Sequence, residues 1–445
     1  MPENFHIDMP EAVRNIIHTI EEHGFKAYAV GGCIRDSILG RNPDDWDITT
    51  SAVPSQIKTF FKRTVDTGIA HGTVTIMIDK TGYEVTTYRI DGEYEDGRHP
   101  KSVEFSDRLV DDLCRRDFTI NAMAYNDTDG FVDEFKGLDD LDTKIIRCVG
   151  EPELRFTEDA LRMMRAIRFS AQLGFTIDEA TWNAIKKLSP SISKISMERV
   201  HVELGKTLMS AHPDYVAQYS EAGLFAPILP VIDNALKSRY KRKILATLQH
   251  TPDNIYLRYA ALFITSTPDE AAKTLRALKL DNKTVNTVSK LVELSKMDIE
   301  ETEPAVRTAL NKYGRDFLPL WHELMMAVIQ ASEDITGISN PAKVKHLLTL
   351  KRLGTDILAR GDCFTIKALD ISGNDLIEYG LQGHEIGETL KSLLDIVIEN
   401  PKLNDKATLI AMIEHINKYN HKITLTGCLL FWIHINYIGF GEGFF

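Results

Sequence analysis

A chain of 445 residues is too long for one compact core, because folded domains usually contain about 100–200 residues. Its composition, 43% hydrophobic and 26% charged, is that of an ordinary globular protein. Its five cysteines are an odd number and include no C-x-x-C pair, which fits a reduced cytoplasm better than a disulfide framework or a zinc site. The net charge of −12 disfavours indiscriminate binding to DNA or RNA, so an RNA partner would need a local basic surface.

The first predicted elements alternate between helix and strand. Apolar residues at helical spacing predict a helix over residues 10–23, and the run 27–30 predicts a short buried strand. Gly31 and Gly32 end this strand before helical spacing resumes. A strand, a double glycine and a helix start let backbone N–H groups approach an anion, with Arg35 close by. The alternative for two adjacent glycines is a simple turn.

Two carboxylates follow, Asp45 and Asp47, separated by one residue. In a strand, alternate side chains share a face, so these carboxylates would project together and repel each other. Mg²⁺ relieves such repulsion, because it takes oxygen ligands, usually one or two carboxylates together with substrate phosphates. The alternative is a solvated acidic turn, since isolated Asp-x-Asp pairs are frequent by chance.

The next region is rich in residues that favour strands. Residues 73–78 and 83–88 predict a hairpin, and Glu84 lies on its second strand. Glu84 is either a third acid of a metal site or a solvent-facing residue. Glycines, charges and a proline in residues 91–100 predict a mobile loop.

A short helix is predicted over residues 109–114, and two arginines follow it. Arg115 and Arg116 stand beside Asp117, so a surface ion-pair cluster is one interpretation. The other is phosphate binding, because arginine is suited to bidentate phosphate contacts.

A strong helix is predicted to begin at Thr157, with apolar residues at helical spacing from Ala160 onward. On this helix Asp159 and Arg162 would lie together, away from the apolar stripe. The alternative to a functional role is an intrahelical ion pair on an exposed face.

Beyond about residue 190 the pattern is almost entirely helical. Residues 237–243 carry five basic side chains, a candidate contact for an RNA backbone or else a solvated helix face. Residues 423–441 contain no Lys, Arg, Asp or Glu, but His434, Asn436 and several glycines dilute this run, so a membrane anchor is not expected. The N-terminus carries no secretion signal.

Six motifs occur together in one order, in residues 31–36, 39–41, 45–50, 115–122, 158–162 and 195–199. They include Gly31-Gly32, Asp45-Trp46-Asp47 and Glu158-Asp159-Ala160-Leu161-Arg162. With them the sequence resembles the bacterial class II tRNA nucleotidyltransferases, the CCA-adding enzymes of the polymerase-beta-like superfamily. The motifs cover about residues 25–205, and the helical character extends the resemblance to about residue 415.

The resemblance implies an α+β head, with a small mixed sheet and helices, followed by an all-α neck, body and tail in a sea-horse arrangement. The implied parts are a catalytic head over residues 1–145, a neck with the nucleotide-recognition motif over 146–205, a body over 206–330 and a tail over 331–420. The apolar residues 421–445 have no counterpart and no assigned role.

The resemblance also implies roles for individual residues. Asp45 and Asp47 hold two Mg²⁺ ions, with Glu84 as a further catalytic candidate, and Asp96 and Arg98 belong to a flexible loop associated with the final A addition. The implied nucleotide-binding residues are Gly31, Gly32, Arg35, Arg115, Arg116, Asp117, Asn121, Asp159, Arg162, Arg165 and Arg168.

The implied activity is addition of C, C and A to the 3′ end of tRNA from CTP and ATP, with release of pyrophosphate after in-line attack of the tRNA 3′-hydroxyl. Asp159 can accept from an exocyclic amino group while Arg162 donates to the adjacent ring nitrogen. Cytosine and adenine present that edge, whereas uracil and guanine present a carbonyl and an N–H.

Other functions stay open at this point. An enzyme that adds only A, one that adds only the two Cs, and a poly(A) polymerase share most of these motifs. A catalytically idle RNA-binding module is disfavoured by the intact acid pair, and a small-molecule nucleotidyltransferase would not need the long helical region. No His-Asp phosphohydrolase pattern is present, so phosphatase activity is not expected, and the oligomeric state is left open.

Overall fold

The computed structural model describes residues 6–92 and 103–418. The predicted loop residues Asp96 and Arg98 and the apolar extension 421–445 lie outside the described residues. The chain divides into two compact units, with the division between Val288 and Ser289.

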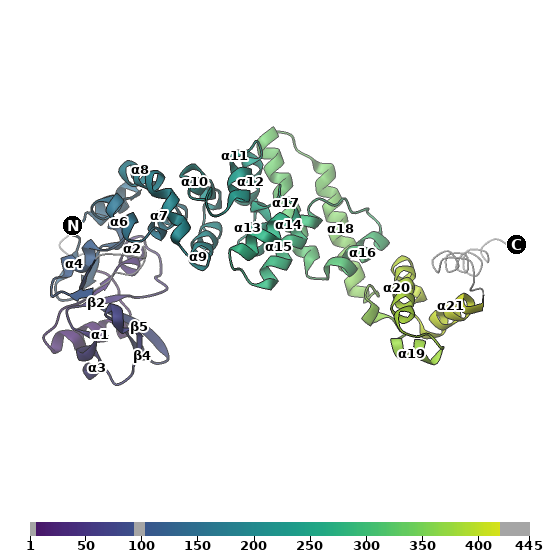
Figure 1. Cartoon of the computed structure of the whole chain (residues 1–445), viewed down its shortest axis with the longest axis horizontal. Coiled ribbons are helices and arrows are strands. Elements are labelled where there is room, and N and C mark those ends of the chain that lie inside the picture. The colour runs from purple at the N-terminus through teal and green to yellow at the C-terminus, as the bar shows by residue number, and fades with distance from the viewer. Residues whose placement is uncertain (1–5, 93–102, 419–445) are drawn as a thin grey trace. The chain divides into compact units, whose positions relative to one another are not determined.

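The first unit contains a mixed sheet of seven strands in the order β3-β4-β5-β2-β1-β8-β9. Its strands β2, β4 and β5 are labelled in the purple part of Figure 1. The strands are β1 (Ala27–Val30), β2 (Ile48–Thr50), β3 (Thr64–Gly68), β4 (Thr73–Ile78), β5 (Thr81–Thr87), β8 (Ala124–Asn126) and β9 (Gly130–Val132). The β2 and β5 strands run parallel, with Ile48 opposite Val85, and the other neighbours are antiparallel. The predicted strand at 27–30 and the predicted hairpin are confirmed.

Shorter strands and helices complete this α+β part. The pairs are β6 (Arg89–Asp91) with β7 (Val103–Phe105), and β10 (Ile145–Ile146) with β11 (Thr176–Ile177). The helices are α1 (Glu11–Glu22), α2 (Gly32–Ile38), α3 (Pro54–Phe60), η1 (Ile69–His71), α4 (Leu109–Cys114), η2 (Thr119–Asn121) and α5 (Gly137–Thr143).

The core of the sheet explains why β1 is central. All four of its residues are buried, because both faces of the strand are covered. Tyr28 and Val30 belong to an apolar cluster with Tyr88 and Leu113, the latter from α4. Alternation along the strand directs Ala27 and Ala29 to the opposite face. Because β1 is buried on both faces, the residues that directly precede and follow it are held in place. Gly31 is the residue that follows it.

Helices make up the rest of the first unit. They are α6 (Pro152–Glu158), α7 (Leu161–Leu173), α8 (Glu179–Leu188), η3 (Ser189–Lys194), α9 (Met197–Leu208), η4 (Pro213–Tyr215), α10 (Val216–Glu221), α11 (Pro230–Lys237), α12 (Lys241–His250), α13 (Ile255–Leu262) and α14 (Pro268–Ala277). The next helix, α15 (Asn282–Leu294), spans the division between the units. The predicted order of an α+β head followed by helices is confirmed.

One helix prediction is wrong. No single helix begins at Thr157, because α6 ends at Glu158 and α7 begins at Leu161. Asp159 between them is extended, with φ −142° and ψ 104°. Its carboxylate Oδ1 accepts from the backbone N–H of Leu161 at 3.0 Å. Aspartate competes for backbone donors in this way, which favours helix starts over helix interiors.

The second unit is helical in the residues that the structure describes. Its elements are α16 (Glu303–Tyr313), α17 (Phe317–Thr336), α18 (Pro341–Arg360), η5 (Ile366–Ala368), α19 (Gly373–Glu378), α20 (His384–Glu399), η6 (Pro401–Leu403) and α21 (Lys406–Lys418). The predicted boundary between residues 330 and 331 lies inside α17, and the four-part division of the chain stays a prediction.

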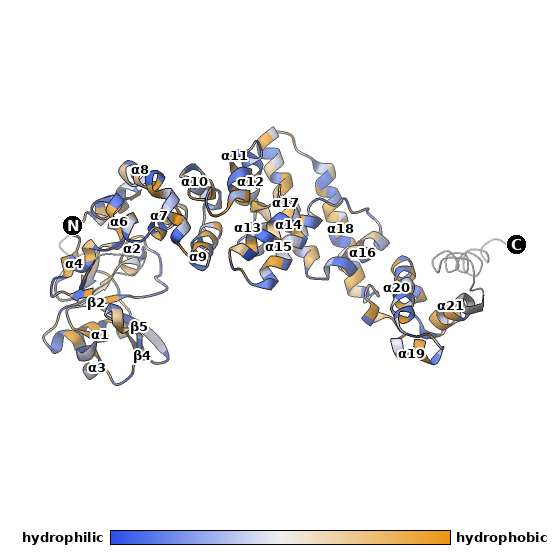
Figure 2. Ribbon diagram, in the orientation of Figure 1, coloured by the Kyte–Doolittle hydropathy of each residue, from blue (hydrophilic) through white to orange (hydrophobic). Residues whose placement is uncertain are grey.

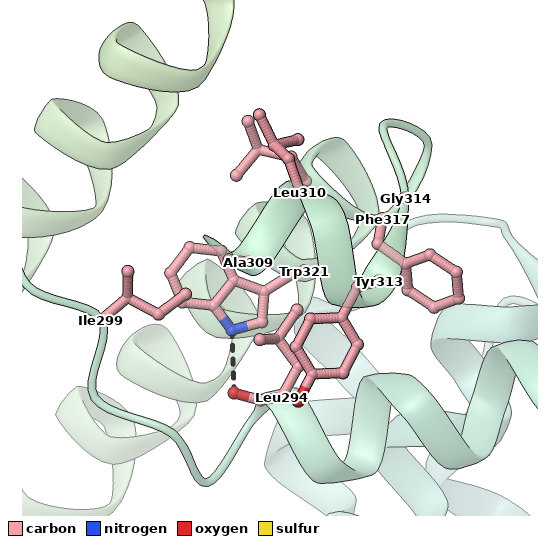
Figure 3. A pocket seen from close by; sticks show the side chains of 9 residues that line it. Leu294, Ile299, Ala309, Leu310, Tyr313, Gly314, Phe317 and Trp321 are labelled. Carbon is pink, nitrogen blue, oxygen red and sulfur yellow. Dashed lines mark hydrogen bonds between the residues drawn. The ribbon is translucent and has the colours of Figure 1, made fainter. Parts of the chain in front are cut away.

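Trp321 of α17 is a large buried side chain of the second unit, with 2% of its surface exposed. Its indole N–H donates to the carbonyl of Leu294 at 3.2 Å, and apolar side chains surround the ring (Figure 3). Along the helices hydrophobic and hydrophilic residues alternate in bands (Figure 2). Among the described residues no helix combines the length and apolar character that a membrane crossing requires.

Candidate functional site

Asp45 and Asp47 lie at the start of β2, just before its first residue, Ile48. They are therefore outside a strand, the setting in which their side chains would share one face, although the carbonyl of Asp47 accepts from the N–H of Val30 at 3.0 Å. Because β1 and β2 are antiparallel, the end of β1 meets the start of β2. The acid pair and Gly31 consequently lie at the same edge of the sheet.

The acid pair is electrostatically strained. The pKa of Asp47 is raised, first by lost hydration and also by the charge of Asp45, while Arg116 acts in the opposite direction. Partial loss of hydration raises the pKa of Glu84 as well, although this residue is exposed, and the charges of Asp47 and Asp45 add to this shift. Asp47 and Glu84 are thus both close enough to a neighbouring carboxylate to be affected by its charge.

Oxygen donors that repel each other suit a hard divalent cation with one or two protein carboxylates and phosphate ligands. Within the described part of the chain, however, no three His, Cys, Asp or Glu side chains form a ready metal centre. Asp45 and Asp47 thus fit a cation that also takes ligands from a substrate. A metal role for Glu84 stays a prediction.

Gly31 forms the turn between β1 and α2. Its φ of 86° lies in the left-handed region, and a Cβ there would come within 2.9 Å of Arg116 Nη1. Glycine is needed for both reasons, since an L side chain would strain the backbone and displace the guanidinium. The turn thus brings Arg116 beside the acid pair.

The Gly31→Ala variant is expected to lower nucleotide incorporation by about 10- to 100-fold, because it moves Arg116 as well as straining the backbone by about 1–2 kcal/mol. Steady-state rates and thermal unfolding measure the two effects. Gly24 is a matched control, since its φ is 84° but a Cβ there meets nothing within 4 Å. A Gly24→Ala variant that lost as much activity would contradict a role for the contact with Arg116.

The paired arginines are held by Asp112 of α4, whose side chain is fully buried. Its Oδ1 accepts from Arg115 at 2.6 and 2.9 Å, and its Oδ2 accepts from Arg116 at 3.2 Å and from the Thr49 hydroxyl at 3.0 Å. Although burial alone would raise it, the two guanidiniums lower the pKa of Asp112. Sequence reasoning missed this residue, although an acid three and four positions before two arginines was a usable signal. In the structure α4 ends at Cys114, so both arginines follow the helix that carries Asp112.

Replacement of Asp112 by Asn is expected to lower the free energy of unfolding by about 3–5 kcal/mol at pH 7, because two guanidiniums lose a buried counter-charge. A depressed carboxyl pKa stabilises the fold fully above the unfolded value of about 3.9, and this contribution is lost progressively as pH falls from there through the lower pKa of the folded state. The difference from wild type should therefore shrink towards pH 3 in urea unfolding. Asp111→Asn on the same helix is the control, because Asp111 pairs with the Ser106 hydroxyl. Equal differences at pH 7 and pH 3 would contradict this assignment.

A second network joins η2 to α7. Asp117 accepts from Asn121 Nδ2 at 3.0 Å and from Arg165 Nε at 2.7 Å. The Asn121 side chain accepts in turn from Arg35 Nη1 at 2.6 Å, and Arg35 also pairs with Asp36 at 2.8 Å. Burial acts to raise the pKa of Asp117, but the charge of Arg165 and the hydrogen bond from Asn121 hold it well below its ordinary value.

Asp159 and Arg162 have different partners at the start of α7. Arg199 of α9 donates to both Asp159 oxygens, at 2.7 and 3.3 Å. Arg162 pairs with Glu158 at 2.6 Å and donates to the carbonyl of Arg115 at 3.0 Å. The intrahelical Asp159–Arg162 pair considered from the sequence is thus replaced by pairs with other residues. The contact with Arg115 connects this region directly to the paired arginines.

Comparison with known proteins decides the family. The chain matches the Poly A polymerase head domain over residues 27–147, the probable RNA and SrmB-binding site of polymerase A over 174–236, and the putative tRNA nucleotidyltransferase domain 2 over 256–413. A CCA-adding enzyme of Pediococcus pentosaceus is 34% identical over 426 residues, which are 94% of this chain and 100% of the relative. The chain belongs to the CCA-adding enzyme family.

Other members of the CCA-adding enzyme family agree along the whole length. The Levilactobacillus brevis CCA-adding enzyme is 36% identical over 420 residues, covering 93% of this chain and 98% of the relative. The crystal structure of the Bacillus stearothermophilus CCA-adding enzyme in complex with CTP has a TM-score of 0.71 at 31% identity, covering 92% of this chain and 98% of that chain. This member of the family is a nucleotidyltransferase, as the sequence motifs predicted.

In this CCA-adding family member the predicted residues fall into connected groups. Gly31, Arg116, Asp45 and Asp47 lie at one sheet edge, and a contact between Arg162 and Arg115 joins the start of α7 to the arginine pair. The predicted residues of the second network are Arg35, Asn121, Asp117 and Arg165. Sequence reasoning missed Asp112, and it missed the pairing of Arg199 with Asp159, although Arg199 lies in one of the six motifs.

Proposed function

We propose that this protein adds C, C and A to the 3′ end of tRNA, using CTP and ATP and releasing pyrophosphate. The observation that carries the proposal is the contact at the start of α7, where Arg162, three residues after Asp159, donates to the carbonyl of Arg115, and the next residue, Arg116, has its guanidinium beside Gly31. Asp159 and Arg162, the residues proposed to select the base, therefore lie in the same compact unit as the paired arginines and the two aspartates proposed to bind the phosphates and the metal.

In the proposed reaction Asp45 and Asp47 hold two Mg²⁺ ions. When bound, such ions lower the pKa of an attacking hydroxyl and offset charge on the phosphates. The chain itself contributes Arg116, which Gly31 admits to the sheet edge, and Arg115, both oriented by Asp112. These guanidiniums would orient the triphosphate for in-line attack at the α-phosphorus.

The chain selects the base through hydrogen-bond complementarity. The Asp159 carboxylate is an acceptor and the Arg162 guanidinium a donor, which suits the amino-plus-acceptor edge of cytosine and adenine. In the structure Arg199 forms an ion pair with Asp159, and Glu158 forms an ion pair with Arg162. A nucleotide base would therefore share or replace these protein partners. Arg165 and Arg168 follow on the same helix as further predicted nucleotide-binding residues.

The basic segment 237–243 supports an RNA partner. Lys237 pairs with Asp233 at 2.8 Å and Lys241 with Glu221 at 2.7 Å, which reduces their local charge. Arg239, Arg242 and Lys243 have exposed side chains, and Arg239 stacks on the exposed ring of Tyr240 at 5.0 Å. Exposed guanidiniums beside an aromatic ring suit a phosphate backbone with an unstacked base. The tRNA contact and the cytoplasmic location stay predictions.

Three other functions remain to be compared with this one. The Poly A polymerase head profile covers only residues 27–147, whereas the tRNA nucleotidyltransferase domain profile covers residues 256–413, which favours a tRNA substrate over poly(A) synthesis. An enzyme that adds only A would have the same site. The acid pair disfavours an idle RNA-binding module.

One experiment separates these functions. The protein is incubated with Mg²⁺ and radiolabelled CTP or ATP, together with tRNA ending before the CCA, tRNA ending after CC, or an unrelated RNA. We expect CTP incorporation into the first, ATP incorporation into the second and none into the third. ATP incorporation into every RNA would indicate a poly(A) polymerase, and ATP incorporation restricted to tRNA ending in CC would indicate an A-adding enzyme. No incorporation at all would contradict the proposal.

A further inference from the structure

Phe169 of α7 lies among three arginines. The Cζ atom of Arg168 is 3.8 Å from the ring centroid, that of Arg35 is 5.0 Å away and that of Arg165 is 5.3 Å away. The ring is only 5% exposed, and Phe118 packs edge-on against it at 5.8 Å. The aromatic face thus meets guanidiniums from two elements, α2 and α7.

Three like charges around one ring need counter-charges, and each arginine has its own. Arg35 pairs with Asp36, Arg165 with Asp117 and Arg168 with Glu203, at distances of 2.6 to 2.8 Å. Each arginine charge is offset by its own acidic partner. The three guanidiniums can therefore lie close to one another around the ring. Cation–π attraction is strongest in such a desolvated setting.

The ring also closes a cycle of contacts. Arg35 donates to Asn121, Asn121 donates to Asp117, and Asp117 accepts from Arg165. Arg35 and Arg165 then meet again at the Phe169 ring. The distance between α2, which follows the Gly31 turn, and α7, which begins at Leu161 two residues after Asp159, is therefore held by hydrogen bonds on one side and by the ring on the other.

We propose that Phe169 is a positioning residue for the nucleotide: it sets the spacing between Arg35 on α2 and Arg165 on α7. This inference rests on the proposed function, because it assigns the sheet edge to the phosphates and the start of α7 to the base. Phe169 itself does not touch the reacting atoms. Loss of the ring should weaken nucleotide binding in the ground state and the transition state alike, which raises KM and leaves kcat nearly unchanged.

The test compares Phe169→Leu with Phe175→Leu, measured with CTP and with ATP on the matching tRNAs. Phe175 is a matched control, because it is also 5% exposed and follows the same helix. We expect Phe169→Leu to raise KM for both nucleotides by about 5- to 30-fold with kcat changed less than about twofold. Phe175→Leu should lower the melting temperature similarly and leave KM within about twofold of wild type.

Phe169→Tyr keeps the ring face and should restore KM to within about threefold of wild type. If Phe169→Leu does not fold, Phe169→Met, which also fills the space without a ring, takes its place in the comparison. Equal KM changes in the Phe169 and Phe175 variants, or a Tyr variant as impaired as the Leu variant, would overturn this inference. Absence of nucleotide addition by the wild-type protein would instead overturn the proposed function.

Discussion

The Asp47→Asn variant is expected to lose nucleotide incorporation by on the order of 10³-fold or more, because the carboxylate that would bind a divalent cation becomes a neutral amide. Its free energy of unfolding without divalent cations should be unchanged or higher. The raised pKa of Asp47 means that its surroundings disfavour the charged form, so a neutral isostere removes a cost at pH 7. Single-turnover incorporation and thermal unfolding measure both effects.

A third measurement separates cation binding from chemistry. Mg²⁺ should raise the melting temperature of the wild-type protein and raise that of Asp47→Asn less, because a ligand that binds only the folded state stabilises it. Asp44→Asn, at an exposed neighbouring position, is the control and should behave like wild type in all three assays. An active Asp47→Asn enzyme, or one that loses activity only because it unfolds, would contradict the assignment.

Replacement of Asp159 by Ala is expected to relax base choice more than it slows phosphoryl transfer. The acceptor for an exocyclic amino group is lost, and one good hydrogen-bonding pair discriminates by about 1–3 kcal/mol, or roughly 5- to 150-fold. The ratio of kcat/KM for CTP and ATP to that for UTP and GTP should fall by that factor. Competition assays with tRNA ending before the CCA and after CC measure this ratio.

The structure adds a second expectation for Asp159→Ala. Arg199 loses its carboxylate partner, so some stability should be lost too, and thermal unfolding must accompany the kinetics. Glu153→Ala on the preceding helix is the control, because Glu153 forms an exposed pair with Lys187 and should alter neither property appreciably. An equal loss of kcat/KM for all four nucleotides would show that Asp159 does not select the base.

Local patterns predicted local structure well. The strand at 27–30, the helix at 109–114 and the first helix agree with β1, α4 and α1 to within a residue or so at either end. Each is specified by its own apolar periodicity and by nearby breaking residues. The prediction failed at Thr157, because the same periodicity continues through the break at Asp159, whose carboxylate accepts from the backbone N–H of Leu161.

The candidate site was predictable as a set of residues but not as a set of contacts. The Asp-x-Asp pair, the double glycine and the adjacent arginines were recognised from residue type and spacing. The hydrogen-bond partners of the site residues could not be predicted, because these partners are distant in sequence. Asp112 and Thr49 are 63 positions apart, and Arg199 and Asp159 are 40 positions apart. Periodicity within one element contains no information about such distant partners.

The sequence by itself therefore determined the class of protein and the residues at which its chemistry should be sought, since the six motifs stand in one order along the chain. The tertiary structure alone decided how those residues are held. The sheet register brings the start of β2 to the end of β1, so the acid pair meets the glycine turn. The packing of α7 and α9 pairs Asp159 with Arg199 and surrounds Phe169 with arginines. These arrangements depend on the burial of elements that are distant in sequence, and only the folded chain brings them together.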